Sequence, residues 1–277
     1  MKQIFLLLGM FFYSSCTSLF YQPDSYLYSD PKVLKLNFEE NFISSKDGTK
    51  LAYWYFKSDK KIAKQSLILF FHGNAQNISA HYYNLAWIVP EGHDFIIFDY
   101  RGYGLSEGKT TPLGVRNDGE AMLDFAYTQF KKGTYQNFIV YGQSLGGNVL
   151  LDSLKTFSHL DEISLGIFDS TFLSYQTLAR EKLKSAIVTY PFNLLAYLLV
   201  SDESNSEKYV KEFTRPTLVI HGTSDKVIPF SFGEEIFEKV GAKDKRFWKV
   251  KDGEHIDVFT NHAKEYQKNF LDLLQSL

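Results

Sequence analysis

The chain has 277 residues, of which 44% are hydrophobic and 22% charged, enough apolar material for one large buried core. The 30 basic and 32 acidic residues leave a net charge of −2, which excludes the basic footprint of a nucleic-acid-binding protein. Cys16 is the only cysteine, so an internal disulfide and a cysteine-ligated metal cluster are excluded.

The N-terminus resembles an export signal. One lysine, Lys2, precedes ten uncharged residues from Ile4 to Tyr13, a length typical of a signal h-region and too short to span a bilayer. Small residues then lead into Cys16, as in the lipobox of bacterial lipoproteins, although Tyr13 stands where that motif prefers an aliphatic residue. We interpret residues 1–16 as a signal peptide with Cys16 as the lipidation site.

Two other interpretations of this leader stay open. The uncharged stretch continues to Tyr21 and would serve as an uncleaved anchor, or the leader is an ordinary cleaved signal. All three place the domain outside the cytoplasm, and the first predicts a lipoprotein of the cell envelope, held to the membrane by its lipid. Residues 17–33 read as an irregular tether, and residues 34–277 as the folded domain.

Two kinds of strand pattern follow the tether. Residues 34–44 and 50–57 alternate apolar and polar side chains around a Lys-Asp-Gly turn, which predicts an antiparallel hairpin. Short unbroken apolar runs then predict strands buried on both faces. These runs cover 67–71, 95–98, 138–141, 165–168 and 217–220, and residues 247–250 are predicted to form a last strand.

Helix-length stretches separate these runs, at 78–88, 115–130, 145–157 and 232–240, and a closing amphipathic helix is predicted over 258–274. Alternating strands and helices predict an α/β fold with a mostly parallel, doubly wound sheet. Ligands of such sheets bind beyond the carboxyl ends of the strands, so the residues after each run are the candidate site.

Residues 171–213 interrupt the alternation with a mostly apolar stretch around Pro191. A helical cap over the mouth of the active site is the favoured interpretation. Additional core helices and a membrane-contacting surface are the alternatives.

Ser144 lies in Gly-Gln-Ser-Leu-Gly between a predicted strand and a predicted helix, the context of a nucleophile elbow. After the first buried run, His72-Gly73-Asn74-Ala75 has the position of the loop that supplies an oxyanion-hole N–H. Asn74 is the favoured donor, with Ala75 next, and Leu145 supplies the second N–H. His72 is expected to support the loop.

Two further strand ends complete the order Ser, Asp, His. Asp225 follows the run 217–220 and His255 follows the last one, so Asp225 would orient the imidazole that takes the proton of Ser144. Asp169, which ends another strand, is the alternative acid. The loop from Asp99 to Ser106 reads as structural, with a substrate-lining role open for Tyr103.

These motifs together resemble the α/β-hydrolase superfamily. The strings HGNA, FDYRGYGLSEG, YGQSLGG, HGTSDKVIP and DGEH look like those of the Bem46 and ABHD12/13/17-like group, from about residue 50 to the C-terminus. The resemblance implies the α/β-hydrolase fold and a serine esterase or thioesterase, with lipid or acyl-chain substrates common among relatives. It assigns Ser144 as nucleophile, Asp225 as acid and His255 as base.

The predicted function is therefore hydrolysis of small-molecule or lipid esters through an acyl-enzyme. No metal or organic cofactor is expected, because the chain lacks an HExxH motif and a dinucleotide fingerprint. A serine peptidase, an acyltransferase and a catalytically idle surface binding protein are the alternatives.

Overall fold

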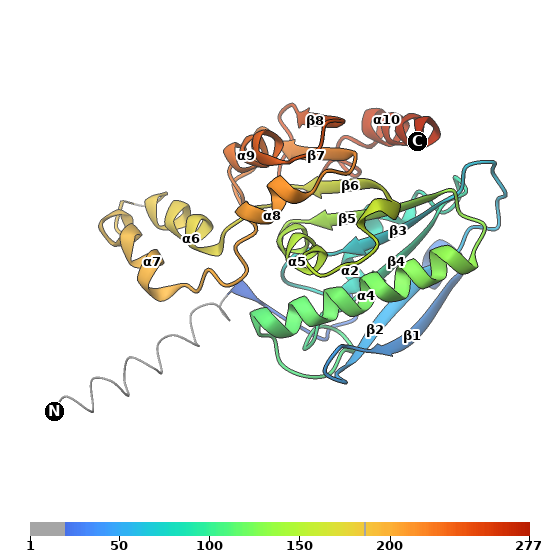
Figure 1. Cartoon of the computed structure of the whole chain (residues 1–277), viewed down its shortest axis with the longest axis horizontal. Helices are drawn as coiled ribbons and strands as arrows, with labels where there is room; N and C mark the ends of the chain where they lie inside the picture. The colour runs from blue at the N-terminus through green and yellow to red at the C-terminus, as the bar shows by residue number, and fades with distance from the viewer. Residues whose placement is uncertain (1–19, 186) are drawn as a thin grey trace.

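The computed structural model describes residues 20–185 and 187–277, and its centre is a sheet of 8 strands in the order β1-β2-β4-β3-β5-β6-β7-β8 (Figure 1). The strands are β1 (Phe38–Ser44), β2 (Lys50–Phe56), β3 (Ser66–Phe71), β4 (Asp94–Phe98), β5 (Asn137–Gln143), β6 (Ile163–Asp169), β7 (Thr217–Gly222) and β8 (Lys245–Val250). The β1–β2 and β2–β4 pairs are antiparallel and all other neighbours are parallel. The predicted α/β fold, with a mostly parallel sheet and an N-terminal antiparallel hairpin, is confirmed.

Helices cover both faces of the sheet because each buried strand alternates its apolar side chains between the two. Leu67, Leu69 and Phe71 face one core, while Ile68 and Phe70 face the other. The first core is covered by α4 (Pro112–Lys132), α5 (Leu145–Leu154) and α9 (Ser231–Lys239), and the second by α2 (Ile78–His81), α3 (Tyr83–Ala86) and α10 (Ala263–Ser276).

Two helices differ from their predicted bounds. The single helix predicted over 78–88 is two short helices, and the N–H groups of Ile88 and Val89 then donate to carbonyls three residues before them, in tighter turns that follow the second helix. The helix predicted to start at Val258 starts at Ala263. Before it, the carbonyl of Asp257 accepts from the N–H groups of Thr260 and Asn261, so the apolar side chains there belong to turns.

The predicted tether has fixed contacts in its described part, residues 20–33. Tyr21 is buried and its hydroxyl lies 3.1 Å from that of Tyr175, while the N–H of Gly104 donates to the carbonyl of Asp24. A short 3-10 helix, η2 (Pro31–Leu34), then leads into β1. The segment crosses the body of the protein before the sheet begins. The predicted signal peptide, with Cys16, lies outside the described residues.

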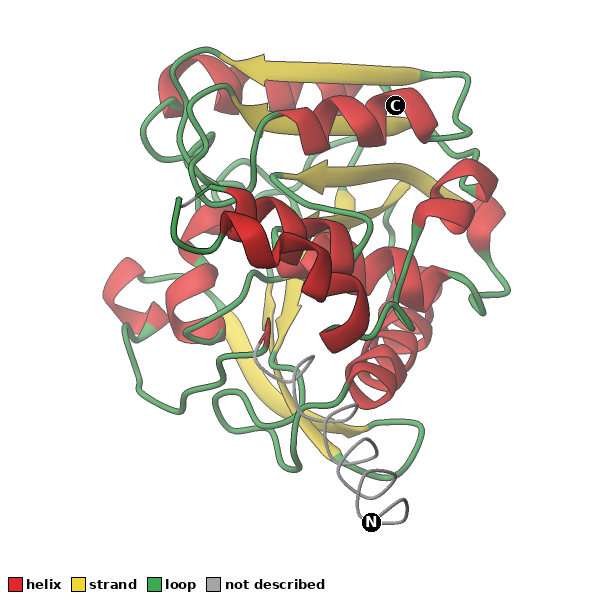
Figure 2. Ribbon diagram, turned by 90° about the vertical axis from the view of Figure 1, so that its left-hand side faces the viewer, coloured by secondary structure: helices red, strands yellow, loops and turns green. Residues whose placement is uncertain are grey.

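The insertion at 171–213 begins at the carboxyl end of β6 and is made of short helices. These are α6 (Tyr175–Lys184), the 3-10 helix η4 (Tyr190–Leu195), α7 (Ala196–Leu199) and α8 (Glu207–Glu212). In Figure 1, α6 and α7 stand out from the sheet, and Figure 2 views them from that side, in front of the strands. Within the described residues, none of the helices has the length and apolar content needed to cross a bilayer.

Candidate active site

The turn between β5 and α5 has the geometry of a nucleophile elbow. Ser144 has φ 54° and ψ −122°, a conformation that L-residues seldom adopt, directly before the first residue of α5. A Cβ atom on Gly142 would lie 2.5 Å from the Cα of Gly147, and one on Gly146 would lie 2.1 Å from the carbonyl oxygen of Phe71. Only glycine fits these two positions, so the motif follows from the close approach of the helix to its neighbouring strand.

The structure brings Ser144, His255 and Asp225 together although they lie far apart in the chain. The Ser144 Oγ and the His255 Nε2 are 3.0 Å apart, and the Nδ1 of the same ring is 2.7 Å from the Asp225 Oδ2. These are hydrogen-bond distances, with the hydroxyl donating to one nitrogen and the other nitrogen donating to the carboxylate. The catalytic role of each residue stays a prediction.

Backbone hydrogen bonds join the loop after β7, which carries Asp225, to the loop after β8, which carries His255. The N–H of Thr223 donates to the carbonyl of Val250, and the N–H of Ser224 donates to that of Gly253, both at 2.9 Å. Gly222 lies so close to the second loop that an added Cβ would be 2.3 Å from the Gly253 carbonyl oxygen. The contact between Asp225 and His255 is therefore supported by backbone bonds between their loops.

The Asp225 carboxylate is anionic despite its burial. Burial alone would raise its pKa, but hydrogen bonds from His221 and His255 hold the pKa of Asp225 well below its ordinary value. Its Oδ1 also accepts from the N–H groups of Val227 and Ile228, at 2.7 and 2.8 Å. The His221 Nε2 lies 3.4 Å from the Asp225 Oδ2, a contact that the motifs do not predict; the one hint in the sequence is that His221 stands four residues before Asp225.

Asp169, the alternative acid, makes its hydrogen bonds with groups other than the His255 imidazole. Its carboxylate accepts from the Tyr141 hydroxyl at 2.6 Å, the Gln143 amide at 3.0 Å and the Ser170 hydroxyl at 3.0 Å. Burial raises the pKa of Asp169, against the effect of these bonds. The backbone carbonyl of Asp169 accepts from the Ser144 N–H, so this residue supports the elbow.

The loop that carries Asn74 lies against the nucleophile. A Cβ on Gly73 would be 3.4 Å from the Ser144 Cβ, and Ala75 has a φ of 58°, in the left-handed region. His72 is fully buried beneath this loop, with its Nδ1 bonded to the Gly73 carbonyl at 2.7 Å. This contact agrees with the supporting role expected for His72.

Two side contacts fix the Asn74 side chain. Its Oδ1 accepts from the Tyr103 hydroxyl at 2.7 Å and from the backbone N–H of Gln22 at 2.9 Å. Tyr103 is completely buried, so it supports the Asn74 loop and does not line an open substrate site. The Gln22 contact cannot be predicted from the sequence, because its donor is a backbone N–H, which nearly every residue type has.

His81 is a second support of this loop. Its Nε2 donates to the Ala75 carbonyl at 3.1 Å, and its ring packs on His72 with the centroids 5.0 Å apart. His93 is also buried, and His262 occupies the N-cap position of α10 without a capping hydrogen bond from its side chain.

The burial of His81 predicts a loss of stability in acid. Burial, with a contribution from His72, lowers the pKa of His81 to about 3, whereas the unfolded chain has a value near 6.5. Between about pH 6.5 and pH 3, His81 is protonated in the unfolded state but neutral in the folded state. The free energy of unfolding therefore falls as the pH falls from about 6.5 towards 3. From pH 7 to pH 5 we expect His81 to cost about 2 kcal/mol in the free energy of unfolding.

Urea unfolding of the wild type and of His81→Gln at these two pH values measures this effect. Glutamine keeps a donor for the Ala75 carbonyl but does not titrate, so the variant should lose about 2 kcal/mol less between them. An equally steep loss in both proteins would contradict the assignment.

An apolar groove lies between the N-terminal segment and the insertion. Its volume is about 310 Å³, and its lining includes Phe20, Ala179 and Leu183 of α6, and Ala196 and Leu199 of α7. The Phe20 ring packs on Tyr175 at 5.1 Å, and two residues further on, the N–H of Gln22 bonds to Asn74. The N-terminal segment therefore connects the groove, which Phe20 lines, to the Asn74 loop beside Ser144, which Gln22 contacts.

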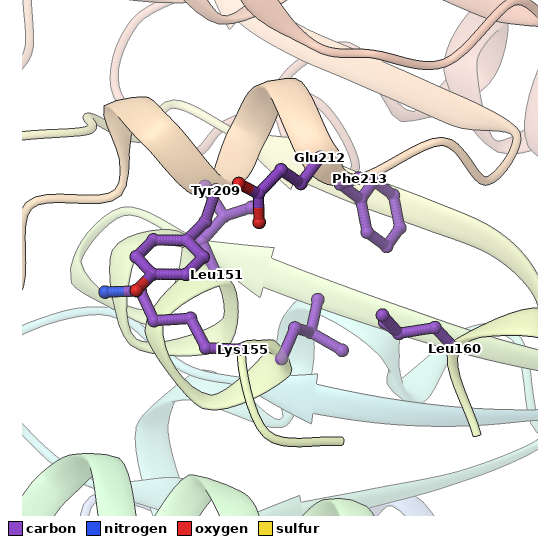
Figure 3. A pocket seen from close by; sticks show the side chains of 7 residues that line it. Leu151, Lys155, Leu160, Tyr209, Glu212 and Phe213 are labelled. Carbon is purple, nitrogen blue, oxygen red and sulfur yellow. The ribbon is translucent and has the colours of Figure 1, made fainter. Parts of the chain in front are cut away.

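A smaller cavity between α5 and α8 is a separate feature. Its volume is about 60 Å³, and Leu151, Lys155 and Tyr209 line it (Figure 3). The Lys155 ammonium lies 3.9 Å from the centroid of the Tyr209 ring. Leu151 lies in the second half of α5, Lys155 directly follows that helix and Tyr209 belongs to α8, whereas Ser144 precedes the first residue of α5. Among the described residues there is no cluster of three or more side chains suited to hold a metal ion.

Comparison with known proteins agrees with this geometry. A family model described as alpha/beta hydrolase fold matches residues 66–187. The chain is 32% identical over 265 residues to YfhR of Escherichia coli K12, a protein described as uncharacterized, covering 94% of this chain and 87% of YfhR. It is 24% identical over 230 residues to the protein bem46 of Schizosaccharomyces pombe, covering 82% and 74%.

Solved structures share the architecture. An esterase of Pyrococcus furiosus, PF2001, superposes with a TM-score of 0.71 at 21% identity, over 93% of this chain and 98% of that one. At that identity the likeness concerns the fold. With the relatives above, it confirms the resemblance drawn from the motifs.

Proposed function

The chain belongs to the α/β-hydrolase family, and we propose that it is a serine hydrolase that cleaves carboxylic esters or thioesters through an acyl-enzyme on Ser144. The observation that carries this proposal is the continuous hydrogen-bonded path from the Ser144 hydroxyl through His255 to the Asp225 carboxylate. A serine is a weak nucleophile by itself, and a neighbouring imidazole oriented by a carboxylate is the arrangement that activates it.

The first half of the reaction acylates Ser144. Its Oγ forms a bond to the carbonyl carbon while its proton moves to the His255 Nε2, and the negative charge of Asp225 stabilises the imidazolium. The carbon–oxygen or carbon–sulfur bond to the leaving group then breaks, and that group takes the proton from His255. In the second half, His255 removes a proton from water as the water oxygen attacks the carbonyl carbon of the acyl-enzyme. The bond from that carbon to the Ser144 Oγ then breaks, the Oγ takes the proton back from His255, and the acid is released.

Two backbone N–H groups serve as the proposed oxyanion hole, those of Asn74 and Leu145. Leu145 is the first residue of α5, where N–H groups have no partner within the helix and the helix dipole favours negative charge. Asn74 lies on the loop against Ser144, fixed by Tyr103 and Gln22. Donors held in place in this way are worth about 2.7–4 kcal/mol each in comparable sites.

The apolar groove supports an acyl chain as the substrate moiety. With p-nitrophenyl esters of increasing acyl length, we expect kcat/KM to rise by up to about fourfold per methylene until the groove is full. Leu183→Asp at the groove should flatten this rise, whereas the exposed Leu105→Asp should not. A series with its maximum at acetate would contradict the acyl-chain proposal and leave the esterase proposal standing.

We also propose that the protein is a lipoprotein of the cell envelope, anchored through Cys16. The support is the leader sequence, with its short uncharged run and small residues before the single cysteine. Mass spectrometry of the mature protein should find a diacylated or triacylated Cys16 as the first residue, and Cys16→Ser should abolish that species. An intact Met1 in the wild type would contradict the proposal.

A further inference from the structure

We infer that the outer face of the insertion docks on a lipid bilayer. We call this surface the cap face and define it as the exposed apolar side chains between Ile187 and Leu199. Ile187 is 94% exposed, Val188 82%, and Leu194 and Leu198 about 62% and 63%. They come from the chain before η4, from η4 and from α7, which follow one another within one short segment.

Exposure on this scale is unusual for a protein surrounded only by water. Single exposed apolar residues are normal, and Val33, Leu113 and Val227 are examples elsewhere on this chain. A run of them on adjacent turns, with no charged residue from Ile187 to Val200, instead marks a surface that contacts a membrane or another protein. Short helical segments with one apolar face bind at the boundary between lipid head groups and acyl chains.

The N-terminal leader identifies lipid as the occupant. Phe20, the first described residue, lines the same groove as Leu199 of α7. Cys16 precedes Phe20 by four residues, and four residues span at most about 14 Å when fully extended. A lipid on Cys16, or insertion of the apolar run before it, therefore keeps the groove and the adjoining cap face close to the bilayer surface. The inference rests on the proposed leader and does not require hydrolase activity.

The charges beside the cap face indicate how it binds. Arg180, Lys182 and Lys184 precede it, with Glu181 among them in an ion pair with Lys184, and Asp202 and Glu203 follow it. With both signs at its borders, the surface has no strong preference for anionic lipid. Docking should therefore depend on apolar burial and change little with salt, unlike binding through a basic patch.

Tryptophan reporters in the full chain test the inference. Leu198→Trp places a reporter on the cap face, and Leu113→Trp places a matched one on the first turn of α4, where the wild-type residue is 48% exposed. Vesicles of phosphatidylcholine with brominated acyl chains quench indoles that reach the acyl region. We expect the emission added by Leu198→Trp to fall by more than half, at low and at high salt. The Leu113→Trp protein should respond as the wild type does, with its three native tryptophans.

Other outcomes overturn the inference. Sedimentation of the protein with vesicles without quenching of the cap reporter means that the leader alone holds the membrane. Equal quenching of both reporters means unspecific adsorption. A concentration-dependent blue shift of the cap reporter without quenching means that a second copy covers this face. Because the readout is depth in the bilayer, an inactive protein would give the same result, so failure of the proposed hydrolase function is separately visible.

Discussion

Replacing Ser144 with alanine is expected to lower kcat for ester hydrolysis by roughly a million-fold while the protein stays folded, in line with the loss of the nucleophile in other serine hydrolases. The substitution removes the only hydroxyl hydrogen-bonded to the His255 Nε2 among the described residues. Alanine has a Cβ atom as serine does, so the substitution leaves the backbone strain at position 144 unchanged. Initial rates with a p-nitrophenyl ester, together with a thermal melt, measure both effects.

The matched control for this variant is Ser224→Ala. Ser224 is an exposed serine in the Asp225 loop and contributes to the loop contacts through its backbone N–H, which alanine retains. The initial rate of ester hydrolysis by Ser224→Ala should equal that of the wild type within experimental error. Substantial turnover by Ser144→Ala after purification would mean that another group forms the acyl-enzyme.

Replacing Asp225 with asparagine is expected to lower kcat by roughly 10⁴-fold, the loss known for the same change in a serine protease triad. The asparagine keeps the shape of the side chain but has no charge to stabilise the His255 imidazolium. It also presents an amide that favours the wrong tautomer of the ring. The bonds from Val227 and Ile228 require only an acceptor oxygen, so the loop itself should hold.

Asp169→Asn is the informative comparison for that variant. Asp169 accepts three hydrogen bonds below the elbow and makes none with His255, so its amide should cost far less turnover and mainly lower the melting temperature. Rates and melts of both variants in one buffer separate the two effects. If Asp169→Asn lost more turnover than Asp225→Asn while remaining folded, the assignment of the acid would be wrong.

The strands of the sheet, and the meeting of the loops at their carboxyl ends, could be predicted from the sequence for a physical reason. Strands such as β3 (Ser66–Phe71) are buried on both faces, so their side chains are mostly apolar, and their carboxyl ends meet at one edge of the sheet. The glycines around Ser144 are required because an added Cβ would lie as little as 2.1 Å from a neighbouring backbone atom. Local sterics of this kind leave a strong pattern in residue type.

Other features depend on contacts that residue type does not encode. The bounds of α3 and α10 depend on local turns beside them, such as those in which Ile88 and Val89 donate to carbonyls three residues before them. The bond from Gln22 to Asn74 uses a backbone donor, and the support from His81 requires two loops to be packed together. The shape of the insertion, and with it the groove, depends on how short helices pack around Pro191, which periodicity over a few residues cannot predict.

Labelling with a fluorophosphonate tests the central claim most directly, because the reagent reacts with a serine hydroxyl only when that hydroxyl is activated as a nucleophile. Mass spectrometry of the digested wild type should find the phosphonyl adduct on the peptide that contains Ser144 and on no other serine. His255→Ala, which keeps the hydroxyl but removes its base, should label far more slowly. An unlabelled wild type, or an adduct elsewhere with Ser144 unmodified, would contradict the account.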